Sequence, residues 1–157
     1  MFVSYTTLEK SAKIWIYQSD REILDTELNT IKKELHFFCD HVWTSHGQTV
    51  KCSFKLFNWF LCLFVDESLH KTSGCSIDSS VKYIKNLQNK YDVDFFNRTN
   101  IAYLDNQNTK ILPLEEFKLI IKPDMMIYNN LVKTKEEFET EWIIPLYKSW
   151  LNKYLKK

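Results

Sequence analysis

Residues 48–57 and 59–65 form two neighbouring strand patterns that set the centre of the expected fold. In the first, apolar side chains alternate with polar ones, whereas the second is apolar throughout. Alternation is typical of a strand with one face in water, and a continuous apolar run is typical of a strand buried on both faces. A tight turn near Asn58 would join the two into a hairpin. We therefore expect the second strand at the centre of a sheet and the first nearer an edge.

Helix patterns lie on either side of this hairpin along the chain. The first is capped by Asp25, and its buried face would carry Leu24, Leu28, Ile31, Leu35, Phe38 and Val42. The second runs from Ile77 to Tyr91, with Ser76 as a cap. Strand patterns at 12–18 and 101–104 complete the order strand, helix, strand, strand, helix, strand.

That order predicts an α+β fold with a ferredoxin-like (split βαβ) antiparallel sheet and helices on one face. We expect one domain over 1–157, with this core at 12–105 and a mainly helical extension at 106–157 packed on it. Within the extension we predict a short strand at 110–112, a helix at 114–121, a strand at 125–128, and a helix that begins at Thr134 and restarts at Pro145. The chain has only two Gly and three Pro, which indicates short loops.

Composition sets several classes of function aside. The net charge of +1 provides no field that would hold nucleic acid or an anionic membrane. Aromatic residues make up 15% of the chain, and the patterns around Trp142 and Trp150 indicate core packing rather than a base-stacking platform. The amino terminus does not resemble a signal peptide, and no apolar stretch is long enough to cross a membrane. We therefore expect a soluble cytoplasmic protein whose four cysteines are free thiols.

Polar residues converge at one end of the predicted sheet. The hairpin places His46 beside Asp66 and Glu67, and the second helix would begin at the same end with Cys75. A cysteine at a helix amino terminus meets the positive end of the helix dipole, which favours its thiolate. We predict a polar cleft at these four residues and favour a binding or interaction protein, with an unidentified protein or small molecule as its partner.

Two chemical alternatives use the same residues. In a cysteine-dependent enzyme, Cys75 would be the nucleophile or redox thiol, His46 its base, and Asp66 or Glu67 the group that orients the imidazole. A metal site could draw on His46, Asp66, Glu67, His70 and Asp78, but their spacing matches no known ligand signature, so we predict neither a metal nor a cofactor. His36 and His41 are expected to face solvent.

The only two arginines leave a similar choice open. Arg21 and Arg98 could each clamp an anion with two hydrogen bonds or close an ion pair with a nearby carboxylate.

Several strings along the chain resemble a family of small uncharacterised bacterial proteins that are often labelled "ABC transporter ATPase". The most specific is Ser73-Gly74-Cys75-Ser76-Ile77-Asp78, and others include Trp15 to Glu22, Trp43 to Gly47, Val65 to Glu67, Val93 to Arg98 and Tyr128 to Val132. Ser45 stands where that family is expected to have Ala. The chain contains no G-x-x-x-x-G-K-[ST] loop to cradle phosphates, so we expect no ATP binding or hydrolysis despite the label.

A second resemblance lies in the carboxy-terminal third. Lys110 to Phe117, together with Met126 to Leu131, is similar to the strand-helix-strand core of small GYF-type peptide-binding modules, although the leading Trp-Tyr pair and the glycine before the proline are missing. This resemblance implies a binding role.

Overall fold

The computed structural model describes residues 1–45, 47–67 and 74–156, with the side chains of Ser45, Cys75 and Ser76 outside that description. Its elements in chain order are η1 (Tyr5–Thr7), β1 (Lys13–Gln18), α1 (Asp25–Phe37), the π-helical turn η2 (Phe38–Val42), β2 (Thr44–Ser45), β3 (Gln48–Thr49), β4 (Lys51–Phe57), β5 (Phe60–Asp66), α2 (Gly74–Tyr91), β6 (Asn100–Asp105), β7 (Asn108–Pro113), α3 (Leu114–Phe117), β8 (Met126–Tyr128), α4 (Lys135–Glu141), β9 (Ile143–Pro145), η3 (Leu146–Lys148) and η4 (Trp150–Tyr154).

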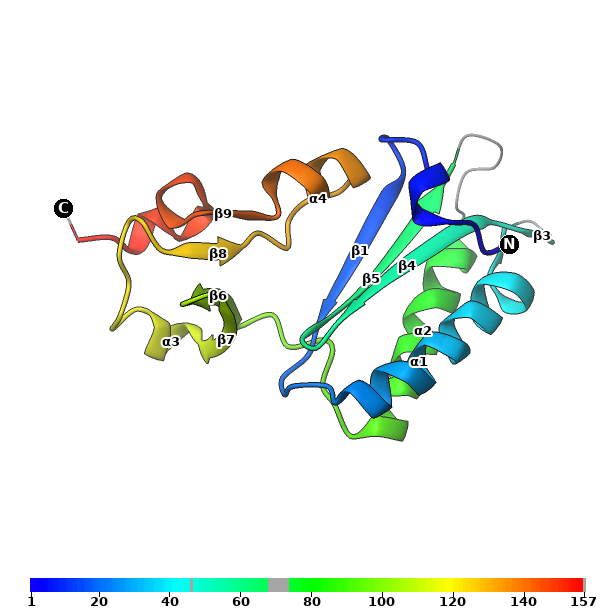
Figure 1. Ribbon diagram of the computed structural model, residues 1–157, viewed down its shortest axis with the longest axis horizontal. Coiled ribbons are helices and arrows are strands. Elements are labelled where there is room, and N and C mark those ends of the chain that lie inside the picture. The colour runs from blue at the N-terminus through cyan, green and yellow to red at the C-terminus, as the bar shows by residue number, and fades with distance from the viewer. Residues whose placement is uncertain (46, 68–73, 157) are drawn as a thin grey trace.

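The first sheet confirms the predicted hairpin and its central strand. Its order is β1-β5-β4, and both pairings are antiparallel. β1 and β4 therefore run parallel to each other, joined by α1, with β5 between them. β5 is buried along its whole length, as its apolar run predicted. Helices α1 and α2 lie side by side on one face of this sheet (Figure 1), where Ile31, Leu35, Ile84 and Leu87 join one core with Leu61, Leu63 and Val65.

The opposite face of the first sheet is covered by segments from both ends of the chain. Phe60, Cys62 and Phe64 of β5 point to this side. They pack against Leu8 near η1 and against Phe138 and Trp142 in and after α4. The first sheet is thus buried on both faces, which explains why the central strand carries no polar side chain before Asp66.

The α+β class is confirmed, but the ferredoxin-like sheet is not. The predicted fourth strand, now β6, lies in a second antiparallel sheet of order β7-β6-β8-β9, beside the first in Figure 1. Backbone of residues 133–135 instead pairs with the outer edge of β1: Ile14 N donates to Lys133 O at 3.1 Å, and Lys135 N donates to Ala12 O at 2.8 Å. β6 and residues 133–135 both carry backbone N–H and C=O groups that could pair with the edge of β1. Which of the two pairs there depends on contacts between residues far apart in the sequence.

The second sheet begins with a two-residue hairpin between β6 and β7. Asn106 and Gln107 both have positive φ, at 50° and 69°, as the turn that joins such closely paired strands requires. Its core brings together Ile101, Tyr103, Phe117, Ile127, Leu146 and Leu151. The prediction that the helix from Thr134 kinks or restarts at Pro145 and reaches Leu155 is wrong, because α4 ends at Glu141. The chain then forms β9, which pairs with β8 and places Ile144 opposite the buried Ile127.

Candidate functional site

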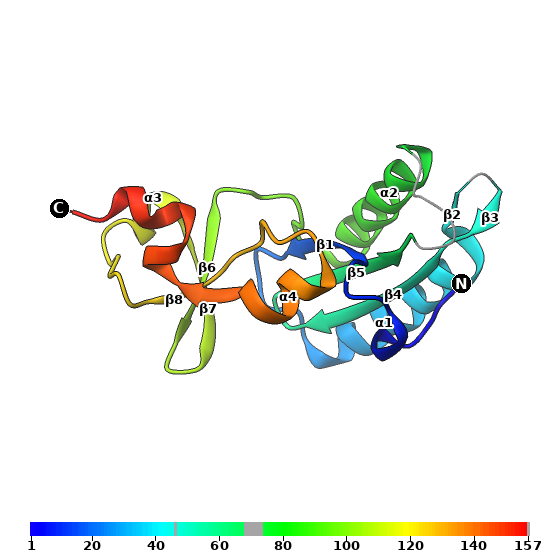
Figure 2. The same ribbon diagram turned by 90° about the horizontal axis from the view of Figure 1, so that it is seen from above.

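The elements that carry the predicted site residues share one end of the first sheet. β5 ends there at Asp66, α2 begins there, and the β2–β3 ribbon lies between α2 and η2, in contact with both (Figure 2). His46 and His70 lie outside the described residues. Cys75 is in the first turn of α2, and its side chain is likewise outside the description. The shared end is therefore as predicted, whereas the cleft itself stays a prediction.

The neighbouring carboxylates Asp66 and Glu67 lie in different surroundings. Asp66 is 4% exposed and lies opposite Lys51 in the register of β4 and β5. Alternation along β5 places it on the face of Phe64, away from the face that α2 covers. Glu67 forms an ion pair with Lys13, with Oε1 and Nζ 2.9 Å apart. The two carboxylates thus differ in burial: Asp66 is enclosed, whereas Glu67 is partly exposed beside Lys13.

An exposed apolar patch that the sequence pattern did not predict lies at this end of the molecule. Phe37 is 59% exposed and Val42 is 43% exposed, and the His41 ring stacks at a tilt on Phe37 with ring centroids 4.7 Å apart. We call Phe37, His41 and Val42 the Phe37 patch. The prediction that Val42 is buried is wrong because η2 is a π-helical turn, which rotates the residues after Phe38 out of the 3.6-residue register. A π-helical turn of this kind cannot be detected from the spacing of apolar residues in the sequence.

The Asp40 side chain, next to His41 of this patch, binds the backbone at Phe2. Phe2 N donates to Asp40 Oδ1 at 2.8 Å, and Asp40 Oδ2 lies 3.2 Å from His36 Nε2. The Phe2 N–H is the main cause that lowers the pKa of Asp40, with smaller contributions from His36 and His41. His36 and His41 face solvent, as predicted.

The described cysteine side chains are buried free thiols. Cys39, Cys52 and Cys62 form no disulfide and have no exposed surface. Cys52 Sγ donates to Cys39 O at 3.8 Å. The neighbouring Cys52 thiol and burial raise the pKa of Cys39, and burial raises the pKa of Cys62. None of these three thiols is accessible to solvent.

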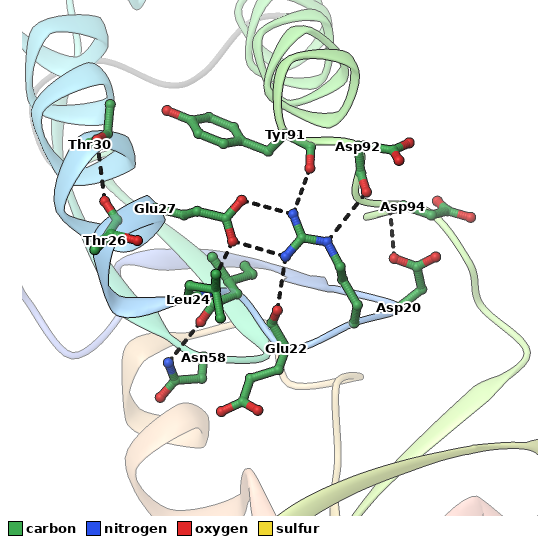
Figure 3. Close-up of polar contacts among 12 residues, drawn as sticks. Asp20, Glu22, Leu24, Thr26, Glu27, Thr30, Asn58, Tyr91, Asp92 and Asp94 are labelled. Carbon is green, nitrogen blue, oxygen red and sulfur yellow. Dashed lines mark hydrogen bonds and ion pairs between the residues drawn. The ribbon is translucent and has the colours of Figure 1, made fainter.

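Arg21 closes an ion pair rather than an anion site. Its guanidinium pairs with Glu27, with Nη1 to Oε1 at 2.9 Å and Nη2 to Oε2 at 2.8 Å. Figure 3 labels Glu27 and the surrounding residues Glu22, Tyr91 and Asp92. The remaining N–H groups of Arg21 donate to the carbonyl oxygens of Glu22, Tyr91 and Asp92. All five donors of the side chain are thus engaged within the protein, where they join the start of α1 to the end of α2.

An open groove lies beside α4. Its volume is about 710 Å³, and it runs between residues 9–11 and α4, lined by Glu9, Lys10, Ser11, Thr134, Glu136, Glu137, Thr140 and Glu141. Four of its eight lining residues are glutamates, and Glu137 Oε2 already accepts a hydrogen bond from Lys133 N at 2.9 Å. The groove lies beside α4, which packs on the opposite face of the first sheet from α2.

Comparisons with known proteins identify no relative: no family model, no curated protein and no solved structure matches this chain. Within the described ranges, no three His, Cys, Asp or Glu side chains are close enough together to hold a metal ion. No helix among the described residues is both long and apolar enough to cross a membrane.

Proposed function

We propose that this chain is a cytoplasmic binding protein whose partner contacts the end of the first sheet where β5 ends and α2 begins. The observation that carries the proposal is the Phe37 patch, with two apolar side chains 59% and 43% exposed beside the elements that carry His46, Glu67 and Cys75. Clustered exposed apolar side chains with polar neighbours are typical of protein interaction sites. The resemblance to GYF-type peptide-binding modules favours the same class of function.

The partner in this proposal is a protein or a small molecule. The net charge of +1 argues against nucleic acid and against an anionic membrane, and the missing phosphate loop argues against ATP. Glu67 is the better placed carboxylate of the predicted cleft, because its ion pair with Lys13 leaves 17% of its side chain exposed.

A matched pair of variants tests the proposal. The prediction that Leu24 is buried is wrong: it is the N-cap of α1, before the first helical turn, and is 59% exposed. Phe37, at the other end of α1, is also 59% exposed. Lysate of the source organism would be passed over the immobilised chain, over Phe37→Ser and over Leu24→Ser, and the retained proteins and metabolites identified by mass spectrometry. We expect at least one species to be retained by the wild type and by Leu24→Ser but lost with Phe37→Ser. Identical retention by all three chains contradicts the proposal.

The second candidate function is an enzyme in which Cys75 is the nucleophile or redox thiol and His46 its base. It is favoured by the place of Cys75 in the first turn of the 18-residue helix α2. Its test is the rate of Cys75 alkylation against pH, followed by mass spectrometry of the peptide that carries Cys75. A midpoint well below the value of about 8.5 for a free thiol, raised by His46→Ala, supports the enzyme. Labelling only after unfolding would leave the binding protein as the better account.

A further inference from the structure

A cluster of aromatic rings and lysines lies in the carboxy-terminal segment, at the opposite end of the molecule from the Phe37 patch (Figure 1, red). Trp150 is 41% exposed, and its ring centroid lies 6.1 Å from that of Tyr154 in an edge-to-face pair. Lys153 Nζ lies 5.5 Å from the Trp150 centroid and 5.1 Å from that of Tyr154. Lys118 Nζ, from the end of α3, lies 4.5 Å from the Tyr154 centroid.

The core position predicted for Trp150 is thus wrong, whereas Trp142 is buried as predicted. The chain after Glu141 does not continue as a helix, so the helical spacing of the two tryptophans no longer applies. Short 3-10 turns η3 and η4 bury Leu146 and Leu151 instead and leave the Trp150 ring at the surface.

An almost fully exposed leucine extends the cluster. Leu119, next to Lys118, is 85% exposed, the highest value among the exposed large apolar residues that the structure describes. We call Lys118, Leu119, Trp150, Lys153 and Tyr154 the Trp150 surface. An exposed Trp ring edge-to-face with a partly exposed Tyr ring is typical of the anchors of protein interfaces, and Leu119 adds an exposed aliphatic side chain next to Lys118 in the chain.

The charge around this surface is predominantly positive but mixed. Residues 142–157 include four lysines and no Asp or Glu. Acidic side chains stand close to the other part of the surface: Glu115 Oε1 pairs with Lys118 Nζ at 3.0 Å, and Glu116 is also exposed. A uniform polyanion such as nucleic acid or an anionic bilayer would be repelled by these carboxylates. A peptide can place its own carboxylates on the lysines and avoid the glutamates.

We propose that the Trp150 surface binds an acidic peptide segment of a partner protein, with aromatic or aliphatic side chains on the rings and Leu119 and carboxylates on Lys153 and Lys118. The proposal is independent of the Phe37 patch, because the two surfaces share no residue and lie at opposite ends of the molecule.

The test is selection of random displayed peptides, about a dozen residues long, on the immobilised full chain. We expect the enriched peptides to combine Asp or Glu with aromatic or aliphatic residues. Their affinity should fall roughly tenfold or more with Trp150→Ala, as truncation of an interface anchor commonly does. It should also fall with Lys153→Glu, whereas Lys32→Glu, the same charge reversal on the exposed side of α1, should leave it unchanged.

The exposed position of Lys153 keeps the test decisive even if Trp150→Ala unfolds the chain. Enrichment of no peptide, or of peptides without acidic residues, overturns the proposal, as does binding that Lys153→Glu leaves intact. Binding of the chain to phosphatidylserine vesicles and to a single-stranded oligonucleotide is measured in parallel. If either binds the chain and Lys153→Glu abolishes that binding while no acidic peptide is selected, the surface recognises phosphate groups instead. Loss of peptide binding with Phe37→Ser but not with Lys153→Glu would show that the peptides bind the Phe37 patch, and would overturn the proposal.

Discussion

Asn130 donates from Nδ2 to Oε1 of Gln18 at 2.8 Å, although the two residues are 112 positions apart in the chain. This hydrogen bond is the middle one of three that link polar groups across the junction of the two sheets, which we call the relay. Gln18 Nε2 donates to Asn100 O at 3.1 Å, and Trp142 Nε1 donates to Asn130 Oδ1 at 2.9 Å. Gln18 and Trp142 are both buried, so each hydrogen bond in the relay satisfies a group that water does not reach.

Replacing Asn130 with Ala should destabilise the junction. The substitution leaves the Trp142 indole N–H and Gln18 Oε1 without partners, and an unsatisfied buried polar group costs about 1–3 kcal/mol. We expect a loss of this size in the free energy of unfolding, measured by urea denaturation. Asn152→Ala, which removes an exposed amide, is the control and should change stability by less than about 0.5 kcal/mol. Equal stability of the two variants would show that the relay is not a stabilising feature.

Lys135 should hold the amino-terminal segment on the first sheet. Its side chain is buried, and Nζ donates to Tyr5 O and to Leu8 O, both at 2.9 Å. Lys135→Ala would leave the Leu8 carbonyl without its donor, whereas Tyr5 O keeps the Leu8 N–H. We therefore expect faster amide hydrogen exchange in residues 3–12 and a loss of about 1–3 kcal/mol in the free energy of unfolding. Lys133→Ala, the same truncation at an exposed lysine on the adjacent backbone, should leave exchange unchanged. Exchange that stays slow in Lys135→Ala argues against this role.

The Arg21–Glu27 pair should make stability depend on pH in the acid range. The Arg21 guanidinium is the main cause that lowers the pKa of Glu27 from 4.5 to about 2 in the folded protein. A carboxylate whose pKa is lower in the folded state stabilises the fold above pH 4.5, and the contribution is lost as pH falls from 4.5 towards 2. The difference in free energy of unfolding between wild type and Glu27→Gln should therefore shrink across this window.

The measurement for this pair is urea denaturation at neutral pH and at about pH 3, with Glu22→Gln as the control. Glu22 is exposed, and only its backbone carbonyl contacts Arg21. A pH-independent difference for Glu27→Gln, or the same pH profile for both variants, contradicts the assignment.

The hairpin between β6 and β7 should gain stability from a glycine. Gln107 has a φ of 69°, a left-handed conformation that costs a non-glycine residue about 1 kcal/mol. Gln107→Gly removes that cost, at the expense of a more flexible unfolded chain, so we expect a gain of about 0.5 kcal/mol in the free energy of unfolding. The same change at exposed Gln48, within β3, should destabilise or have no effect. A loss of stability in Gln107→Gly would show that its side chain makes a contact worth more than the strain.

Local patterns predicted most of the elements because helix and strand periodicities depend on neighbouring residues. The alternation at 48–57, the apolar run at 59–65 and the two amphipathic helices were all read from spacings of two to four residues. The structure has the apolar strand and the two helices, but it divides 48–57 into β3 and β4, which belong to different sheets. Departures occur where a local irregularity intervenes, as at η2, or where strand pairing overrides helical spacing, as at Ile143–Pro145. Cys39, Cys52 and Cys62 are free and buried, as their apolar surroundings indicated.

The choice of partner for each strand could not be read in this way. β6 and residues 133–135 were both able to pair with the edge of β1, and only the packing of α4 and Trp142 on the first sheet settles which does so. The same holds for the surface, where exposure of Phe37, Leu119 and Trp150 depends on what the rest of the chain covers.

By itself the sequence determined most of the strands and helices and the hairpin that makes β5 the central strand of the first sheet, because periodicity and hairpin connectivity are short-range. Tertiary structure alone decided that Asp66 and Glu67 part into different surroundings and that β6 joins a second sheet. Both outcomes depend on contacts between residues far apart in the chain, whose free energies no local pattern records.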